Sequence, residues 1–132
     1  MELSCTHLRY LYAIYEISKK VPDVRSSNIV ECMKVSKPSV CSMLETLMDR
    51  HLIVKRRYGK IYLTDEGYLT AKAYGEHINQ LTGLIPRMQL NLTAEEIQDA
   101  ACALAAVLPE KCWKRQMVET GRREDEKEVT KK

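Results

Sequence analysis

Two short helix signals lie close together between residues 26 and 49, and this spacing limits the fold more than any other feature of the sequence. The first helix should begin near Ser26 or Ser27, whose hydroxyl group can cap the free backbone amides. The second should follow after only a few residues, with Ser36 as its N-cap and Pro38 in the first turn, where proline's missing amide proton costs nothing. Two helices joined by such a tight turn are typical of a helix-turn-helix.

The segments on either side extend this motif. Apolar residues recur every three or four positions between residues 6 and 21, so a preceding helix is expected there, closed by Pro22. Two short runs rich in β-branched and aromatic residues, 53–57 and 60–63, predict a β-hairpin that turns at Tyr58-Gly59. Three helices followed by such a hairpin, the wing, have the order of a winged helix-turn-helix.

The remainder of the chain is expected to be helical. Thr64 should cap a long helix that lasts to about Leu84, and a connection should follow. Thr93 and Glu96 have the spacing of a capping box at the start of an alanine-rich helix. The expected apolar stripe of that helix comprises Ile97, Ala101, Leu104 and Leu108.

Together these patterns predict a mainly α fold with a small β-hairpin. We expect a winged helix-turn-helix DNA-binding domain at residues 1–64 and a linking helix with a helical dimerisation domain at 65–120. A last helix should begin at Pro109 within the second part. The charged segment 121–132 is expected to be a disordered tail.

Several classes of protein are not expected from this composition. No apolar run approaches the roughly 18 residues of a membrane span, and no secretory signal pattern is present, so we expect a cytoplasmic protein. Neither a phosphate-binding Gly-rich loop nor a nucleophile elbow nor an HExxH motif occurs, so we expect no enzyme. Free thiols are expected at five scattered cysteines: Cys5, Cys32, Cys41, Cys102 and Cys112.

The charge distribution favours double-stranded DNA as the partner. Residues 1–63 contain eleven Lys or Arg against six Asp or Glu, whereas the remainder contains ten against twelve. The outward N-terminal end of the third helix carries no acidic residue, which suits entry into a major groove, and the wing would contact phosphates. The expected DNA-binding residues are Arg25, Ser27, Ser36, Lys37, Pro38, Ser39, Ser42, Arg56, Arg57 and Lys60.

A family resemblance rests on three stretches of sequence: THLRYLYAIYEI, VRSSNIVECMKVSKPSVCSMLETLMDRHLI and the wing ending IYLTDEG. They resemble the iron- and manganese-dependent repressors typified by the diphtheria toxin repressor, and the likeness extends over about residues 6 to 118. The chain ends after the dimerisation helices, which looks like the shorter manganese-responsive branch. The resemblance implies a transcriptional regulator, with repression expected, that binds palindromic operators as a homodimer.

In that family a divalent metal joins the first helix to the dimerisation helices and sets the spacing of the two DNA-binding heads. The corresponding ligand positions of this chain are Arg9, Tyr12, His77, Cys102, Ala105 and Ala106. Neither Arg9 nor Tyr12 supplies a donor suited to manganese or iron, and the two alanines supply none. We therefore expect the usual metal site to be degenerate and no cofactor to be bound.

Three alternatives remain open at the level of sequence. A shifted site of thiolates and imidazoles, suited to zinc, would use Cys5, His7, His77 and Cys102. A thiol switch would act through Cys41 on the third helix, where a modification would collide with DNA. A winged helix can also serve as a docking surface for another protein, because the fold alone does not decide the function. The effector and the operator do not follow from the sequence.

Overall fold

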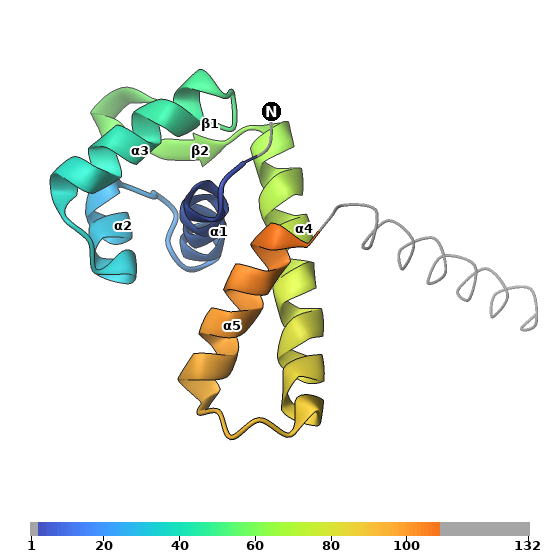
Figure 1. The fold of residues 1–132 in the computed structure, drawn as a ribbon. Helices are drawn as coiled ribbons and strands as arrows, with labels where there is room; N and C mark the ends of the chain where they lie inside the picture. Colours follow the sequence, from blue (N-terminus) through green and yellow to red (C-terminus); the bar gives the residue numbers. More distant parts are fainter. Residues whose placement is uncertain (1–2, 109–132) are drawn as a thin grey trace, which may run out of the picture.

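The computed structural model describes residues 3–108, which form five α-helices, two short 3-10 helices and one antiparallel β-hairpin (Figure 1). In chain order these are α1 (Cys5–Lys20), α2 (Ser26–Met33), α3 (Lys37–Asp49), β1 (Ile53–Lys55), η1 (Arg57–Gly59), β2 (Ile61–Leu63), α4 (Asp65–Leu84), η2 (Ile85–Met88) and α5 (Ala94–Val107). The mainly α fold with a small hairpin is confirmed. The helix expected from Pro109 and the tail expected from Gly121 lie outside the described residues.

Side chains with hydroxyl groups explain where four of these helices begin. The hydroxyl of Thr93 accepts from the backbone N–H of Glu96, and the Glu96 carboxylate accepts from the Thr93 N–H in return, at 3.1 and 2.8 Å. The expected capping box of α5 is therefore confirmed. α1 begins and ends one residue earlier than expected. The capping residues are Ser4, Ser36, Thr64 and Thr93.

The start of α2 differs from the expectation. Ser26 and Ser27 lie inside its first turn, and Arg25 occupies the N-cap position. The backbone N–H of Arg25 donates to the side-chain oxygen of Asn28 at 2.9 Å. The side chain of Asn28, three residues further on, therefore satisfies the backbone at the start of the helix. The expected serine cap is wrong because asparagine can form the same short-range contact from inside the helix.

The hairpin is shorter than expected. Its two strands pair with Ile53 opposite Leu63 and Lys55 opposite Ile61. Arg57 belongs to the 3-10 turn η1 and not to a strand, so the expected two-residue turn at Tyr58-Gly59 is wrong. The backbone N–H of Arg56 donates to the carbonyl of Lys60 at 2.7 Å and closes a three-residue loop. Within this loop, Tyr58 and Gly59 both have positive φ.

Two hydrophobic clusters hold these elements together. The first joins α1, α2, α3 and the hairpin, and it confirms the core face expected for α3. The second lies between α4 and α5. α4 contributes Ala71 to the first cluster and Tyr74 to the second, so one continuous helix belongs to both (Figure 1). The domain division at residues 64 and 65 stays a prediction.

Small side chains form the contact of α5 with α4. Ala101, Cys102 and Ala105 are buried, because alanine and cysteine let the two helix backbones approach closely. Leu104 is 37% exposed, so its expected place in the core is wrong. The buried face is rotated away from Leu104 toward the small residues. Within residues 3–108, no helix has both the length and the apolar character of a membrane span.

Candidate nucleic-acid interface

The first turns of α3 present mostly small side chains that are exposed to solvent. Lys37, Pro38, Ser39 and Ser42 are all exposed, and Val40 between them is buried. Ser36 caps the helix through the backbone N–H of Ser39 at 3.3 Å, and its hydroxyl also donates to the Ser39 hydroxyl at 2.8 Å. The pattern follows from helical periodicity, since the core face and the outward face alternate.

Acidic residues of α3 lie farther along the same helix. Glu45 and Asp49 are exposed in its second half, beyond the small residues of the first turns. The N-terminal half of α3 is therefore free of carboxylates and has the positive end of the helix dipole. This end can approach a polyanion without like-charge repulsion.

The loop of the wing carries the expected basic side chains. Arg56 and Arg57 are exposed at the turn of the hairpin. Lys60 is only partly exposed, because its Nζ lies 3.3 Å from the carboxylate of Asp23 in an ion pair. Figure 1 shows α3 and the loop between β1 and β2 on the side of the molecule that faces away from α4 and α5. The structure thus brings the predicted helix and the predicted wing to one side.

Arg25 lies just ahead of α2 as expected, and it forms a contact that the sequence did not predict. The sequence predicts a phosphate contact at the start of α2, but the guanidinium Nη1 donates to the backbone carbonyl of Tyr58 at 3.1 Å. Arg25 therefore connects the start of α2 to the wing loop, 33 residues further along the chain. Ser27 is exposed in the first turn of α2, as a phosphate contact requires.

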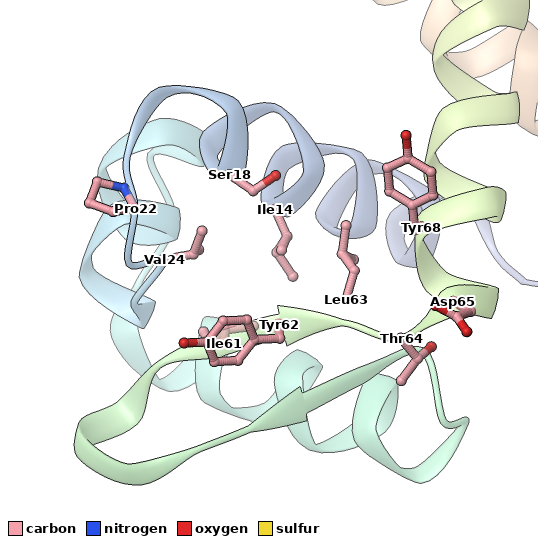
Figure 2. Close-up of a pocket in the computed structure, with 10 residues that line it drawn as sticks. All are labelled: Ile14, Ser18, Pro22, Val24, Ile61, Tyr62, Leu63, Thr64, Asp65 and Tyr68. Carbon is pink, nitrogen blue, oxygen red and sulfur yellow. The ribbon is translucent and has the colours of Figure 1, made fainter.

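A hollow of about 300 Å³ lies between α1, β2 and the first turn of α4 (Figure 2). Ile14 and Val24 are buried at its base, while Tyr62 and Asp65 are exposed beside it. The backbone N–H of Ile61 donates to the carbonyl of Val24 at 2.8 Å beside this hollow. The hollow therefore lies where strand β2 of the wing packs against α1 and the start of α4.

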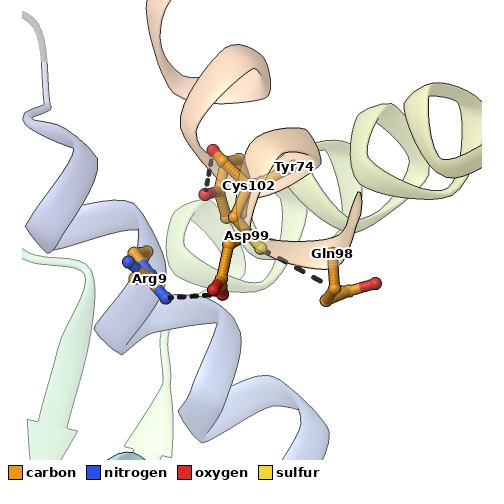
Figure 3. Close-up of polar contacts among 5 residues, drawn as sticks. All are labelled: Arg9, Tyr74, Gln98, Asp99 and Cys102. Carbon is orange, nitrogen blue, oxygen red and sulfur yellow. Dashed lines mark hydrogen bonds and ion pairs between the residues drawn. The ribbon is translucent and has the colours of Figure 1, made fainter. Parts of the chain in front are cut away.

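The positions at which the family resemblance suggests metal ligands lie where α1 meets α4 and α5. The guanidinium of Arg9 forms an ion pair with Asp99, with 3.9 Å between Nη2 and Oδ1 (Figure 3). Both side chains are about half or more exposed, so the pair is weak. It nevertheless links α1 to α5 through charges that this chain supplies itself.

Tyr12 is packed into the contact between α1 and α4. Its ring meets the ring of Tyr74 edge-on, with 5.8 Å between centroids, and lies over Gly75, where a Cβ atom would be 2.7 Å from it. Burial, together with a hydrogen bond to Glu16, raises the pKa of the Tyr12 phenol to about 12. Tyr12 is therefore an uncharged phenol at neutral pH.

Cys102 and His77 are partly or fully enclosed. Burial raises the pKa of the Cys102 thiol, and Gln98 approaches its Sγ at 3.9 Å (Figure 3). Tyr74 donates its hydroxyl proton to the Cys102 carbonyl at 2.7 Å. Burial also lowers the pKa of His77. Within residues 3–108, no three His, Cys, Asp or Glu side chains gather closely enough to hold a metal ion. His7, part of the alternative zinc set, engages Ser4 through Nδ1 at 3.1 Å.

Residues 2–61 match the family model described as the iron dependent repressor, N-terminal DNA binding domain. This part of the chain belongs to the iron-dependent repressor family. The matched segment contains α1, α2, α3 and most of the wing, so the surface described above is part of an iron-dependent repressor DNA-binding domain. No curated protein matches the sequence significantly.

Solved structures with the same fold include two metal-dependent regulators. The manganese regulator SloR has a TM-score of 0.69 at 28% identity, and the match covers 83% of this chain and 49% of SloR. The metal-dependent transcriptional regulator MtsR has a TM-score of 0.69 at 25% identity, covering 86% of this chain and 53% of MtsR. The chain thus spans about half the length of SloR and of MtsR.

A third structure has a similar extent. The hypothetical protein SSo2273 from Sulfolobus solfataricus has a TM-score of 0.66, and the match covers 91% of each chain. Its identity is 15%, so it demonstrates likeness of fold alone.

Two residues of this region were missed by sequence reasoning. Asp99 pairs with Arg9 across two helices, and no local pattern connects positions 90 residues apart. Tyr58 was treated only as part of a turn, yet its side chain is 83% exposed at the tip of the wing. The Tyr58-Gly59 dipeptide was the available signal, because a large aromatic residue beside a turn glycine is an unusual choice.

Proposed function

We propose that this protein is a sequence-specific DNA-binding transcriptional regulator, a repressor that acts in the cytoplasm as a homodimer on a palindromic operator. The observation that carries this proposal is the exposed, carboxylate-free start of α3 beside a basic wing. Small polar side chains such as Ser39 and Ser42 can approach base edges in a major groove. Arg56 and Arg57 provide charge for the phosphate backbone.

Exposed apolar side chains near α5 support the homodimer. Two DNA-binding heads on one palindrome require a twofold axis, and a surface that buries apolar groups between copies would provide it. Large apolar side chains are exposed at the end of α4, in and after η2, and on α5: Leu84, Met88, Leu90, Leu104 and Val107. Their concentration away from α3 would leave both DNA-binding surfaces accessible.

We further propose that manganese or iron does not gate DNA binding. The residues at the expected ligand positions do not fit a divalent cation, because Arg9 is itself a cation and Tyr12 is a neutral phenol. Ala105 and Ala106 contribute no donor atoms. The Arg9–Asp99 ion pair supports a different link between α1 and α5, one that needs no metal.

Selection of bound sequences from a random duplex pool tests these proposals together. The selection is run with the purified full chain in chelator, in manganese and in zinc. We expect the same inverted repeat in all three conditions, with unchanged affinity. Binding that requires manganese would contradict the absence of metal gating, and binding that requires zinc would favour the alternative site of thiolates and imidazoles. Failure to enrich any duplex would contradict DNA binding and favour the protein-docking alternative.

A further inference from the structure

The tip of the wing holds a tyrosine in an unfavourable backbone conformation. Tyr58 has φ 62° and ψ 23°, and Gly59 follows with φ 74°. Consecutive left-handed residues in a hairpin turn are ordinarily Asn-Gly or Gly-Gly, because a side chain with Cβ crowds the backbone there. Tyrosine therefore destabilises the free wing relative to asparagine at the same position.

The other residues of this kind have an ordinary explanation. Within residues 3–108, positive φ at residues other than glycine also occurs at Lys34, His51 and Gln89. Each of these follows the end of a helix, where one left-handed residue commonly terminates the helical hydrogen bonding. Tyr58 instead lies between two strands, with its side chain 83% exposed. Its ring thus gains little packing inside the protein to offset the strain.

Hydrogen bonds fix the backbone that presents this ring. Arg25 Nη1 donates to the Tyr58 carbonyl at 3.1 Å. The Gly59 N–H donates to the Arg56 carbonyl at 3.2 Å, and the Arg56 N–H donates to the Lys60 carbonyl at 2.7 Å. The loop is therefore held from within and from α2. A fixed backbone limits the directions that an exposed aromatic ring can take, which lowers the entropy lost on binding.

We propose that Tyr58 is a DNA-contacting residue whose ring enters the minor groove beside the major groove occupied by α3, and that Arg25 positions it. This inference rests on the proposed DNA-binding function. The minor groove is about 6 Å wide, which admits one side chain from a short loop but no helix. The ring can pack on deoxyribose edges, while the exposed Arg56 and Arg57, which directly precede it, meet the negative potential of the groove.

Two substitutions at one position test the contact. Tyr58→Asn removes the ring and suits the left-handed backbone, so the wing should keep its shape and the protein its thermal stability. Tyr58→Phe keeps the ring. We expect Tyr58→Asn to weaken binding to the selected operator about tenfold, and Tyr58→Phe to stay within about twofold of the parent protein.

Dimethyl sulfate footprinting identifies the groove, because it methylates adenine N3 in the minor groove and guanine N7 in the major groove. The parent protein and Tyr58→Phe should protect adenine N3 at the operator's wing positions. Tyr58→Asn should lose that protection and keep the guanine N7 protection caused by α3. Equal affinity and equal adenine N3 protection in Tyr58→Asn and the parent protein would overturn the inference.

Different results would contradict the proposed function and the proposed minor-groove contact. A parent protein that binds no duplex and protects no guanine N7 contradicts the proposed function itself. A parent protein that binds with guanine N7 protection, but is indifferent to the loss of the Tyr58 ring, contradicts only the minor-groove contact.

A double-mutant cycle tests the positioning role of Arg25. If Arg25 acts through the ring, Arg25→Gln should weaken operator binding in the parent protein and add little to Tyr58→Asn. Arg25→Gln should also lose adenine N3 protection, and Arg25→Lys, which keeps a donor, should recover part of it. Additive losses of affinity would overturn this role and assign Arg25 a phosphate contact of its own.

Discussion

Gly67 in the first turn of α4 lies directly against the backbone carbonyl of Leu52, so closely that a Cβ atom on residue 67 would overlap that oxygen. The same carbonyl accepts from the N–H of Thr64 at 3.0 Å. The Thr64 hydroxyl in turn donates to the His51 carbonyl at 2.8 Å and accepts from the Gly67 N–H at 3.0 Å. These contacts join the end of α3, the base of the wing and the start of α4.

Gly67→Ala should destabilise the protein by about 1–3 kcal/mol, the usual cost of forcing an extra carbon into a packed site. Here the obstacle is a backbone oxygen that cannot rotate away. Gly83→Ala is the matched control, because it lies in the same helix with open space around its Cβ position. That change should stabilise α4 by about 0.5–1 kcal/mol. Urea unfolding measures both changes in stability. Equal effects of the two substitutions would contradict the close contact between Gly67 and the Leu52 carbonyl.

Replacing Arg56 and Arg57 with Ala should flatten the salt dependence of binding to random duplex. The slope of log K against log salt should fall by about 0.9 for each phosphate that the variant no longer neutralises. Lys60→Ala should have a smaller effect, since Asp23 already neutralises part of its charge. Lys72→Ala, an exposed lysine of α4, serves as the control and should leave the slope unchanged. An equal change in all four variants would indicate an effect of overall charge and no wing contact.

Leu104→Glu with Val107→Glu should separate the proposed homodimer. Both side chains are exposed on α5, and carboxylates there could not be buried between two copies without a large desolvation penalty. Leu69→Glu changes a similarly exposed leucine of α4 and should leave the dimer intact. Light scattering gives the molar mass of each. A parent protein of monomer mass would contradict the dimer outright.

Cys41 should react much faster with a thiol reagent than Cys102. Cys41 is exposed on α3, whereas Cys102 is buried and its thiol pKa is raised by burial, which reduces the reactive thiolate. Operator DNA should slow the labelling of Cys41 if α3 enters the groove. Peptide mass mapping with and without operator provides the comparison. Unchanged labelling of Cys41 in the complex would place α3 away from the DNA.

Acidification should destabilise the fold through His77. Burial lowers its pKa, so the unfolded chain takes up a proton near the ordinary value of about 6.5, while the folded chain does so only at lower pH. The stabilisation is therefore complete above that ordinary value and is lost as the pH falls toward the folded value. His77→Gln should reduce the loss of stability between about pH 7.5 and about pH 5.5. An identical pH profile in the variant would show that another group titrates.

The sequence was a reliable guide where one local interaction decides the structure. Ser36, Pro38 and Val40 predicted the cap, the first turn and the core face of α3, because each effect acts within one or two helical turns. The capping box at Thr93 was predictable for the same reason. The family of the DNA-binding part was also recognised from three local stretches.

Predictions were incomplete or wrong where segments far apart in the sequence meet. The phosphate contact of Arg25 stays a prediction, and its hydrogen bond to the Tyr58 carbonyl follows only from the folded chain. Leu104 fits a helical stripe by its spacing, but close packing of Ala101 and Ala105 on α4 turns it outward. The degenerate manganese or iron site and the alternative zinc site stay predictions, because only a measurement of metal binding tests them.

α4 is one unbroken helix of 20 residues, about 30 Å long, anchored by Leu52 at one end and by α5 at the other. A rigid helix of this length converts a small change of angle at one end into a larger displacement at the other. A tilt of about 5° at the α5 end would carry the far end through about 2.5 Å. In the proposed homodimer, the angle of α5 against α4 would therefore set the distance between the two DNA-binding surfaces.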